Sequence, residues 1–149
     1  MQAAVGLAQL DRLENFIAKR KQNFNFLKSK LKPFEEFFIL PEPTEASDPA
    51  WFGFPITLRE NAPFLREDLL RHLNQHQVAT RLLFAGNITK QPYFSNQKYR
   101  ISSSLKNTDL IMKNTFWLGV YPKLTEKMLD YSVSAIGNFV KSVVYESQS

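Results

Sequence analysis

The chain has 149 residues, of which 44% are apolar, 22% charged and 13% aromatic. That composition favours one globular domain and excludes disorder as the main state, because the aromatic side chains offer ample surface to bury. No cysteine is present, so disulfides, thiolate metal sites, iron–sulfur ligation and cysteine nucleophiles are excluded within the chain. No apolar run approaches the roughly 20 residues that cross a bilayer, and no basic, signal-like start is present. We therefore expect a cytoplasmic protein.

The formal charge of +5 is confined to residues 1–32. This segment holds seven basic and two acidic side chains, and the rest of the chain is neutral overall. On a helical wheel its lysines lie on both sides of an apolar seam, and lysines near the end of a helix also complement the helix dipole. We therefore interpret them as flanking a packing face, and expect neither a nucleic acid nor a membrane as partner.

Residues 1–32 are predicted to form one long helix that ends at Pro33. The seam recurs at steps of three and four, at Leu10, Leu13, Ile17, Arg20, Phe24, Leu27 and Leu31. At about 1.5 Å per residue this helix would reach roughly 48 Å, beyond the roughly 40 Å diameter of a compact domain of this length. Its first residues offer no capping side chain. We therefore expect a fragment of a larger protein, or one half of an intimate dimer.

Strands and helices alternate along the rest of the chain. Strands are expected over residues 51–58, 78–84 and 116–121, and helices over 65–73, 107–112 and from 125 onward. Pro55 indicates an edge position or a bulge, and Asn107 or Thr108 is expected to cap the short helix. The order predicts an α/β fold with about three strands in a small sheet. Its connections would be right-handed parallel crossovers, or all helices would lie on one face of an open sandwich.

Two polar patterns could indicate a metal site and a glycosylation site. Asp68, His72 and His76 share one side of a predicted helix, but the chain has only two histidines and no fourth ligand, so a solvated flank is preferred to a metal site. Asn87-Ile88-Thr89 matches a glycosylation sequon without any sign of a secretory route. We expect neither pattern to carry the function.

No nucleophile–base pair, paired carboxylates or glycine-rich phosphate loop is found in the sequence. Lys90 and Lys98 lack surroundings that would desolvate a Schiff-base lysine. Arg81 stands in an otherwise apolar strand, and it is expected either to pair with an internal carboxylate or to contact a ligand. It precedes a long irregular stretch at residues 85–106, of a length that usually binds or covers something. No self-sufficient active site is therefore predicted.

Four stretches resemble the C-terminal part of the DegT/StrS-type nucleotide-sugar aminotransferases. They are MQAAVGLAQL at 1–10, SDPAWFGFPITL at 47–58, TRLLFAGNITKQP at 80–92 and NTDLIMKNTFWLGVYPKLTEKMLDY at 107–131. The third and fourth blocks, in this order, are most similar to the branch of CDP-4-keto-6-deoxyglucose 3-dehydrase-like proteins of lipopolysaccharide biosynthesis. The resemblance covers nearly the whole chain.

The resemblance implies the small C-terminal domain of a fold-type-I vitamin B6 enzyme at residues 33–149, preceded by an inter-domain and dimer-facing helix at 1–32. The large domain, which binds pyridoxal or pyridoxamine phosphate, would lie upstream of Met1, as would the cysteines of any iron–sulfur cluster. No cofactor or catalytic residue is thus expected in this chain, and a homodimer is expected for the parent. The parent would remove the C3 hydroxyl of a nucleotide-linked 4-keto sugar, with the chemistry supplied by the cofactor.

The resemblance also implies that the segment from Arg81 to Asn87 approaches the sugar and the cofactor. Arg81, Phe84 and Asn87 would contact the substrate, and Gly86 would permit a close approach. The isolated chain would then be inactive. Two alternatives remain open at this stage: the C-terminal domain of a sugar aminotransferase, and a stand-alone binding module that dimerises through its first helix.

Overall fold

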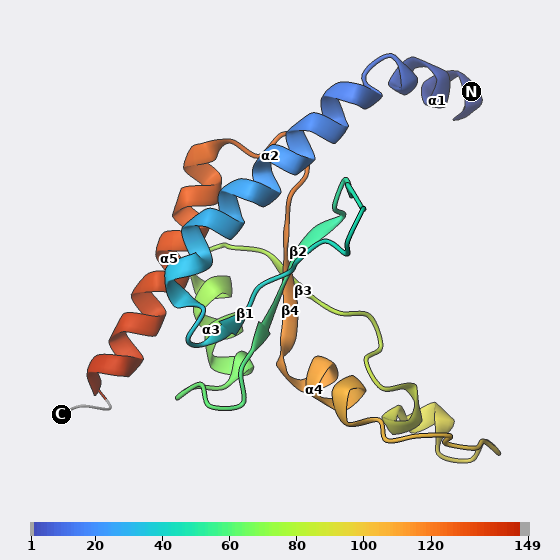
Figure 1. Cartoon of the computed structure of the whole chain (residues 1–149), viewed down its shortest axis with the longest axis vertical. Coiled ribbons are helices and arrows are strands. Elements are labelled where there is room, and N and C mark those ends of the chain that lie inside the picture. The colour runs from blue at the N-terminus through green and yellow to red at the C-terminus, as the bar shows by residue number, and fades with distance from the viewer. Residues whose placement is uncertain (1, 147–149) are drawn as a thin grey trace.

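The computed structural model describes residues 2–146 and shows an α/β fold in two layers (Figure 1). The helices are α1 (Gln2–Leu10), α2 (Leu13–Leu31), α3 (Arg66–Gln75), α4 (Lys106–Asn114) and α5 (Glu126–Glu146). The strands are β1 (Phe38–Ile39), β2 (Gly53–Leu58), β3 (Thr80–Leu82) and β4 (Thr115–Gly119). Three short 3₁₀ turns, η1 (Lys32–Phe34), η2 (Ile88–Lys90) and η3 (Pro92–Phe94), complete the described elements.

The sheet has four strands in the order β1-β2-β4-β3, and every neighbouring pair is antiparallel. Because β2 and β3 both run opposite to β4, they are parallel to each other and are joined through α3. The predicted parallel crossover is therefore present once, but β4 lies between its two strands. Pro55 lies opposite Trp117, and β1 pairs only with Thr57 and Leu58, so at Pro55 the strand has a partner on one side only.

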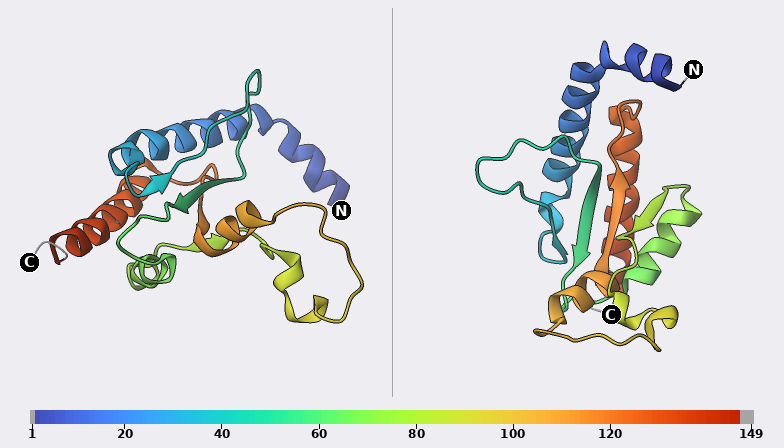
Figure 2. Two further views of the ribbon diagram at one scale, coloured as in Figure 1. Left: turned by 60° about the horizontal axis from the view of Figure 1, so that its bottom comes forward. Right: turned by 90° about the vertical axis from the view of Figure 1, so that its right-hand side faces the viewer.

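Alternation along β2 separates the two faces of the sheet. Phe54, Ile56 and Leu58 are buried in the core, where α2 and α3 each pack against α5 (Figure 2). Their neighbours in sequence lie on the opposite face, where Pro55 pairs with Trp117 across the strands. Helices α2, α3 and α5 therefore lie on one face of the sheet, as in the second of the two expected arrangements, and the connection through α3 is the one parallel crossover of the first.

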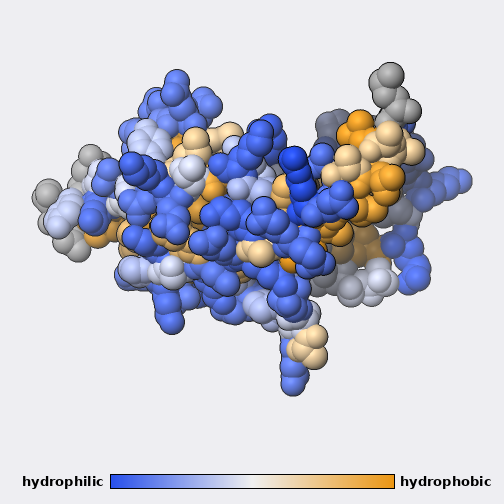
Figure 3. All heavy atoms as spheres, turned by 90° about the horizontal axis from the view of Figure 1, so that it is seen from above, coloured by the Kyte–Doolittle hydropathy of each residue, from blue (hydrophilic) through white to orange (hydrophobic). Residues whose placement is uncertain are grey.

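The predicted single helix over residues 1–32 is wrong, because it breaks at Asp11 and Arg12. The Arg12 N–H donates to the Gln9 carbonyl at 3.0 Å, which closes a tight turn between α1 and α2. No residue of α1 is buried, and its exposed apolar side chains include Val5 and Leu7. Helix α1 lies at the end of the molecule away from the sheet in Figure 1, and hydrophobic surface gathers at that end in Figure 3. The first part of the seam has nothing to pack against in this chain, so its periodicity does not enforce one straight helix.

The basic residues of α2 are largely paired within the chain. Lys21 forms an ion pair with Asp48, and Lys30 pairs with Asp130 of α5. Between these lysines the buried Phe24 stacks on Trp51, with ring centroids 4.6 Å apart. These contacts agree with the interpretation of α2 as a packing helix. None of the helices in the described part of the chain is long and apolar enough to cross a membrane.

The helix caps agree only partly with the prediction. Thr125 caps α5, since its hydroxyl accepts the Met128 N–H at 3.3 Å. Helix α4 begins at Lys106, earlier than predicted, and neither Asn107 nor Thr108 caps it. The Ser104 hydroxyl accepts the Lys106 N–H instead, at 3.3 Å.

Candidate functional site

The chain makes a sharp left-handed turn directly after β3. Phe84 has φ +49° and Gly86 has φ +63°, and the Phe84 N–H donates to the Leu82 carbonyl at 2.9 Å. A bulky side chain at positive φ is a backbone outlier, and such outliers cluster at functional sites. Phe84 is also 87% exposed. The turn therefore presents an aromatic ring to the outside at an energetic cost.

Arg81 lies in the middle of β3, opposite Trp117. Its side chain is exposed, and its guanidinium donates to the Thr80 carbonyl at 3.0 Å. The structure gives it no ion pair within residues 2–146, so an internal carboxylate is not what holds it. The Trp117 indole donates to the Leu82 carbonyl at 3.2 Å and fixes the strand beside it. The remaining guanidinium donors face outward and suit a carboxylate or a phosphate.

Gly86 lies directly on helix α4. A Cβ at this position would come within 2.5 Å of Met112 Cγ and 2.7 Å of Met112 Cβ. Only glycine allows this approach without a shift, and its positive φ adds a second reason. The close approach predicted for Gly86 is therefore present, but it is made to this chain's own helix.

Asn87 is only 2% exposed, and its amide group is used within the chain. Its Nδ2 donates to Asp109 Oδ1 at 2.7 Å, while its Oδ1 accepts the Thr89 N–H at 3.1 Å and the Thr89 hydroxyl at 2.7 Å. The side chain thus caps η2 and ties it to α4. A glycan could not be attached to this buried nitrogen without breaking those bonds.

Asp109 accepts hydrogen bonds from two side chains of the segment. Lys90 Nζ donates to Asp109 Oδ2 at 2.8 Å, and Asn87 bonds the other oxygen. Those two hydrogen bonds, the one from Lys90 first, lower the pKa of Asp109 below its ordinary value. Lys90 is held as an ion-pair partner rather than as a desolvated amine, which does not suit a Schiff-base lysine.

Sequence reasoning did not single out Asp109, Met112 or Trp117. Asp109 and Met112 are three residues apart in α4 and therefore share one helix face, and this spacing is the sequence pattern that could have indicated a common contact surface. Their partners at 86, 87 and 90 lie more than fifteen residues away in sequence, so only the fold brings them together.

A cavity of about 350 Å³ opens beside this segment, under the irregular stretch that follows it. Its lining combines Asn87 and Thr89 with the aromatic rings of Phe94 and Tyr99, whose centroids are 5.0 Å apart, and with Arg100. The stretch extends away from the body of the fold (Figure 1). The long loop and the turn predicted to face a ligand thus border one hollow.

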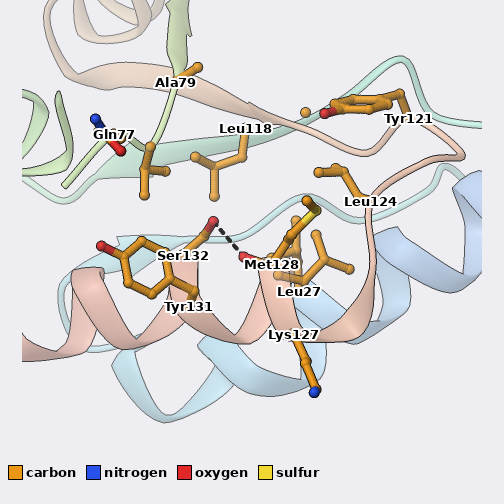
Figure 4. Close-up of a pocket in the computed structure, with 13 residues that line it drawn as sticks. Leu27, Gln77, Ala79, Leu118, Tyr121, Leu124, Lys127, Met128, Tyr131 and Ser132 are labelled. Carbon is orange, nitrogen blue, oxygen red and sulfur yellow. Dashed lines mark hydrogen bonds between the residues drawn. The ribbon is translucent and has the colours of Figure 1, made fainter.

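A second hollow, of about 460 Å³, lies between the N-terminal half of α5 and the sheet (Figure 4). Its lining is mainly apolar, with Leu118, Met128 and Tyr131 among the contributors. The Ser132 hydroxyl, which faces this hollow, donates to the Met128 carbonyl at 3.0 Å. It shares no lining residue with the segment from Arg81 to Asn87, and it offers few groups for chemistry.

Asp68, His72 and His76, for which a metal site was not expected, make contacts within the chain. The His72 and His76 rings stack with centroids 4.1 Å apart, His72 Nε2 bonds the Ala135 carbonyl at 3.1 Å, and Asp68 pairs with Arg71. Within residues 2–146 no three acidic or histidine side chains gather in a way that could hold a metal ion. This side of α3 is only partly solvated, because His72 packs against α5 while His76 is exposed.

The DegT/DnrJ/EryC1/StrS aminotransferase family model matches residues 1–137. The chain belongs to this family. It is 55% identical over 139 residues to the lipopolysaccharide biosynthesis protein RfbH of Salmonella typhimurium, covering 93% of this chain and 32% of that protein. It is 43% identical over 140 residues to the dTDP-4-dehydro-2,6-dideoxy-D-glucose 3-dehydratase of Saccharopolyspora spinosa, covering 94% of this chain and 30% of the relative.

Solved structures of the family share the fold. A GDP-4-keto-6-deoxymannose-3-dehydratase with a trapped PLP-glutamate geminal diamine matches with a TM-score of 0.80 and 23% identity, over 89% of this chain and 34% of that one. An aminotransferase from Psychrobacter cryohalolentis matches with a TM-score of 0.85 and 23% identity, over 96% of this chain and 39% of that one. The chain spans about a third of the length of the curated relatives it matches.

Proposed function

We propose that this chain is the small C-terminal domain of a vitamin B6-dependent nucleotide-sugar 3-dehydratase of lipopolysaccharide biosynthesis, inactive by itself. The observation that carries the proposal is the 55% identity to RfbH over 93% of the chain. A 3-dehydratase is favoured over an aminotransferase by the order of identities. The Saccharopolyspora 3-dehydratase is 43% identical, whereas the dTDP-4-amino-4,6-dideoxy-D-glucose transaminase of Shigella dysenteriae is 26% identical.

The residues of this chain indicate which part of the whole protein binds the cofactor. Lys90, which borders the turn, is bonded to Asp109, and the chain has no cysteine for an iron–sulfur cluster. We therefore assign the anchoring of pyridoxal or pyridoxamine phosphate, and of any cluster, to the part of the relatives that this chain does not span. When bound, the cofactor supplies the electron sink that the loss of a hydroxyl group needs.

Residues 1–32 are assigned to contacts with that missing part and with a second subunit of a homodimer. Support comes from α1, which exposes Val5, Leu7 and Leu10 and buries none of its own residues. An apolar helix of this kind is stable only when a partner covers it. Residues 33–149 then form the small domain itself.

The nucleotide-sugar side of the domain is assigned to the segment from Arg81 to Asn87. Arg81 offers free guanidinium donors to the charged part of the substrate, and the exposed ring of Phe84 covers an apolar part of it. Gly86 and Asn87 complete the segment and join it to α4. Contact with the substrate is thus carried by Arg81 and Phe84, and its geometry by the two residues that follow.

A chimera tests the proposal. This chain replaces the third that it matches in the Salmonella RfbH protein. Pyridoxamine phosphate is supplied in excess, because replacing the C3 hydroxyl by hydrogen consumes two electrons, and the product formed from CDP-4-keto-6-deoxyglucose is identified by mass spectrometry. We expect loss of the C3 hydroxyl at a rate within about tenfold of intact RfbH. A folded, cofactor-loaded but inactive chimera would contradict the proposal.

The role of Arg81 is tested in the same chimera with Arg81→Gln. Loss of a charge-assisted contact is expected to raise KM by about tenfold or more. Arg71→Gln is the matched control, since Arg71 is an exposed arginine on α3 that pairs with Asp68. Equal effects of the two substitutions would remove Arg81 from the substrate site.

A further inference from the structure

The segment that carries Phe84 is held to helix α4 by four contacts. Gly86 packs on Met112, the Asn87 N–H lies 3.4 Å from Met112 Sδ, and the Asn87 amide bonds Asp109 at 2.7 Å. Lys90 Nζ donates a hydrogen bond to the other oxygen of Asp109, Oδ2, at 2.8 Å. All four contacts are made by Asp109 and Met112 on one face of α4, so one helix determines where the segment lies.

The bond between Asn87 and Asp109 is the polar part of this fastening. Asn87 is 2% exposed, and a buried amide that loses its acceptor pays the cost of desolvation without compensation. Its carbonyl oxygen is already shared between two donors of Thr89, so the amide cannot rotate without breaking them. The orientation of Asn87 is thus fixed from both ends.

The turn needs such fastening because its backbone is not relaxed. Phe84 has φ +49° and Gly86 has φ +63°. For Phe84 this left-handed conformation costs free energy, and such a conformation is kept only when several surrounding contacts hold it. Without the contacts at 86, 87 and 90, the exposed ring of Phe84 would have little to keep it in one place.

We propose that Asp109 is a positioning residue that, through Asn87 and Lys90, holds the segment from Phe84 to Lys90 in the shape that meets the nucleotide sugar. This inference rests on the proposed function for its link to the substrate, but the fastening itself is a property of this chain. Asp109 reaches the substrate through Asn87 and the turn rather than by direct contact.

A reciprocal exchange tests the fastening. Asn87→Asp places two carboxylates against each other, and Asp109→Ala removes the acceptor. Each is expected to speed hydrogen exchange of the backbone amides at 84–91 by about tenfold or more, with the amides of β2 and β4 unchanged. The double substitution Asn87→Asp with Asp109→Asn restores a donor opposite an acceptor, and exchange should return to within about threefold of the original chain.

Asp68→Ala is the matched control, because Asp68 is also a helical carboxylate paired with a cation but does not touch the segment. Unchanged exchange at 84–91 in Asn87→Asp, an equal rise in the core strands, or no recovery in the double substitution would each overturn the proposal.

The link to the substrate is read in the RfbH chimera, where Asp109→Ala should raise KM severalfold and leave kcat within about threefold. A loosened segment with unchanged KM would overturn the positioning role. An inactive chimera with every residue of this chain intact would instead contradict the proposed function, so the two failures are distinguishable.

Discussion

At the scale of single residues, the turn after β3 depends on a position that only glycine fits. Gly86 combines a φ of +63° with the backbone and side chain of Met112 in its way. Phe84 also has a positive φ without being glycine, as do Ala46 and Gln77, but its side chain is exposed and meets no such obstacle.

Gly86→Ala is therefore expected to lower the free energy of unfolding by about 2–3 kcal/mol, from backbone strain and from crowding against Met112. Urea denaturation of the two chains measures it. Gly6→Ala is the control, because nothing lies within 4 Å of a Cβ at that exposed helical position. A loss as large in the control as at Gly86 would show that the close approach is not the cause.

Residue roles were only partly predictable from the sequence. The unusual place of Arg81 in an apolar strand was visible, and the structure leaves its guanidinium open. The burial of Asn87 was not visible, because its partner Asp109 lies 22 residues away and reaches it only through the fold. A short polar turn such as Gly-Asn reads as exposed unless the helix that covers it is known.

At the scale of elements, α3 and α5 are joined by a titratable contact. His72 Nε2 bonds the Ala135 carbonyl of α5, and the Tyr131 hydroxyl donates to the His76 carbonyl at 3.2 Å. Burial, and then the neighbouring His76, lower the pKa of His72 below 6.5. On α3 itself, Asp68 and Arg71 pair with each other near this contact.

Because the folded chain favours neutral His72, the unfolded chain binds more protons just below pH 6.5, and stability rises with pH across that window. The unfolding midpoint is expected to fall as the pH drops from about 7 to 5, and the fall should be smaller in His72→Gln. Asp109 does not interfere, because its lowered pKa keeps its carboxylate ionised across this window. The same slope in His72→Gln would contradict this assignment.

Helices α1 and α2 show how far periodicity alone predicts an element. The seam is real from Phe24 to Leu31, where Leu27 and Leu31 are fully buried. Before Ile17 the same spacing continues with nothing packed on it, and the helix breaks at Asp11. Periodicity reports which residues share a face, whereas continuity requires a partner for that face.

Removal of residues 2–10 is therefore expected to change the free energy of unfolding by less than about 0.5 kcal/mol, since α1 buries nothing in this chain. Leu27→Ala, in the buried half of α2, should cost about 2–5 kcal/mol. Thermal and urea unfolding compare the two. A large loss of stability on truncation would mean that α1 already has a partner within the isolated chain.

At the scale of the whole molecule, alternation of apolar residues predicted β2, β3 and β4, and the fold class was correct. The two residues of β1 are too few to show a period, so that strand was missed. The order β1-β2-β4-β3 and its antiparallel pairing depend on contacts between distant segments, and a default of parallel crossovers could not supply them.

Under the proposed function, the small sheet with its open turn at the edge strand β3 forms only part of an active site. The segment from Arg81 to Asn87 supplies guanidinium hydrogen-bond donors and an aromatic ring. Its other polar groups form hydrogen bonds within the chain that keep the segment in place. Under the proposed function, the cofactor chemistry comes from the two thirds of the relatives that this chain does not span.

Titration of the isolated chain with pyridoxal phosphate, followed by absorbance and calorimetry beside full-length RfbH, tests that claim most directly. The account predicts that pyridoxal phosphate does not bind the isolated chain stoichiometrically and that the absorbance spectrum of the cofactor does not change when the chain is added. Binding of one cofactor per chain as tightly as in full-length RfbH would contradict it.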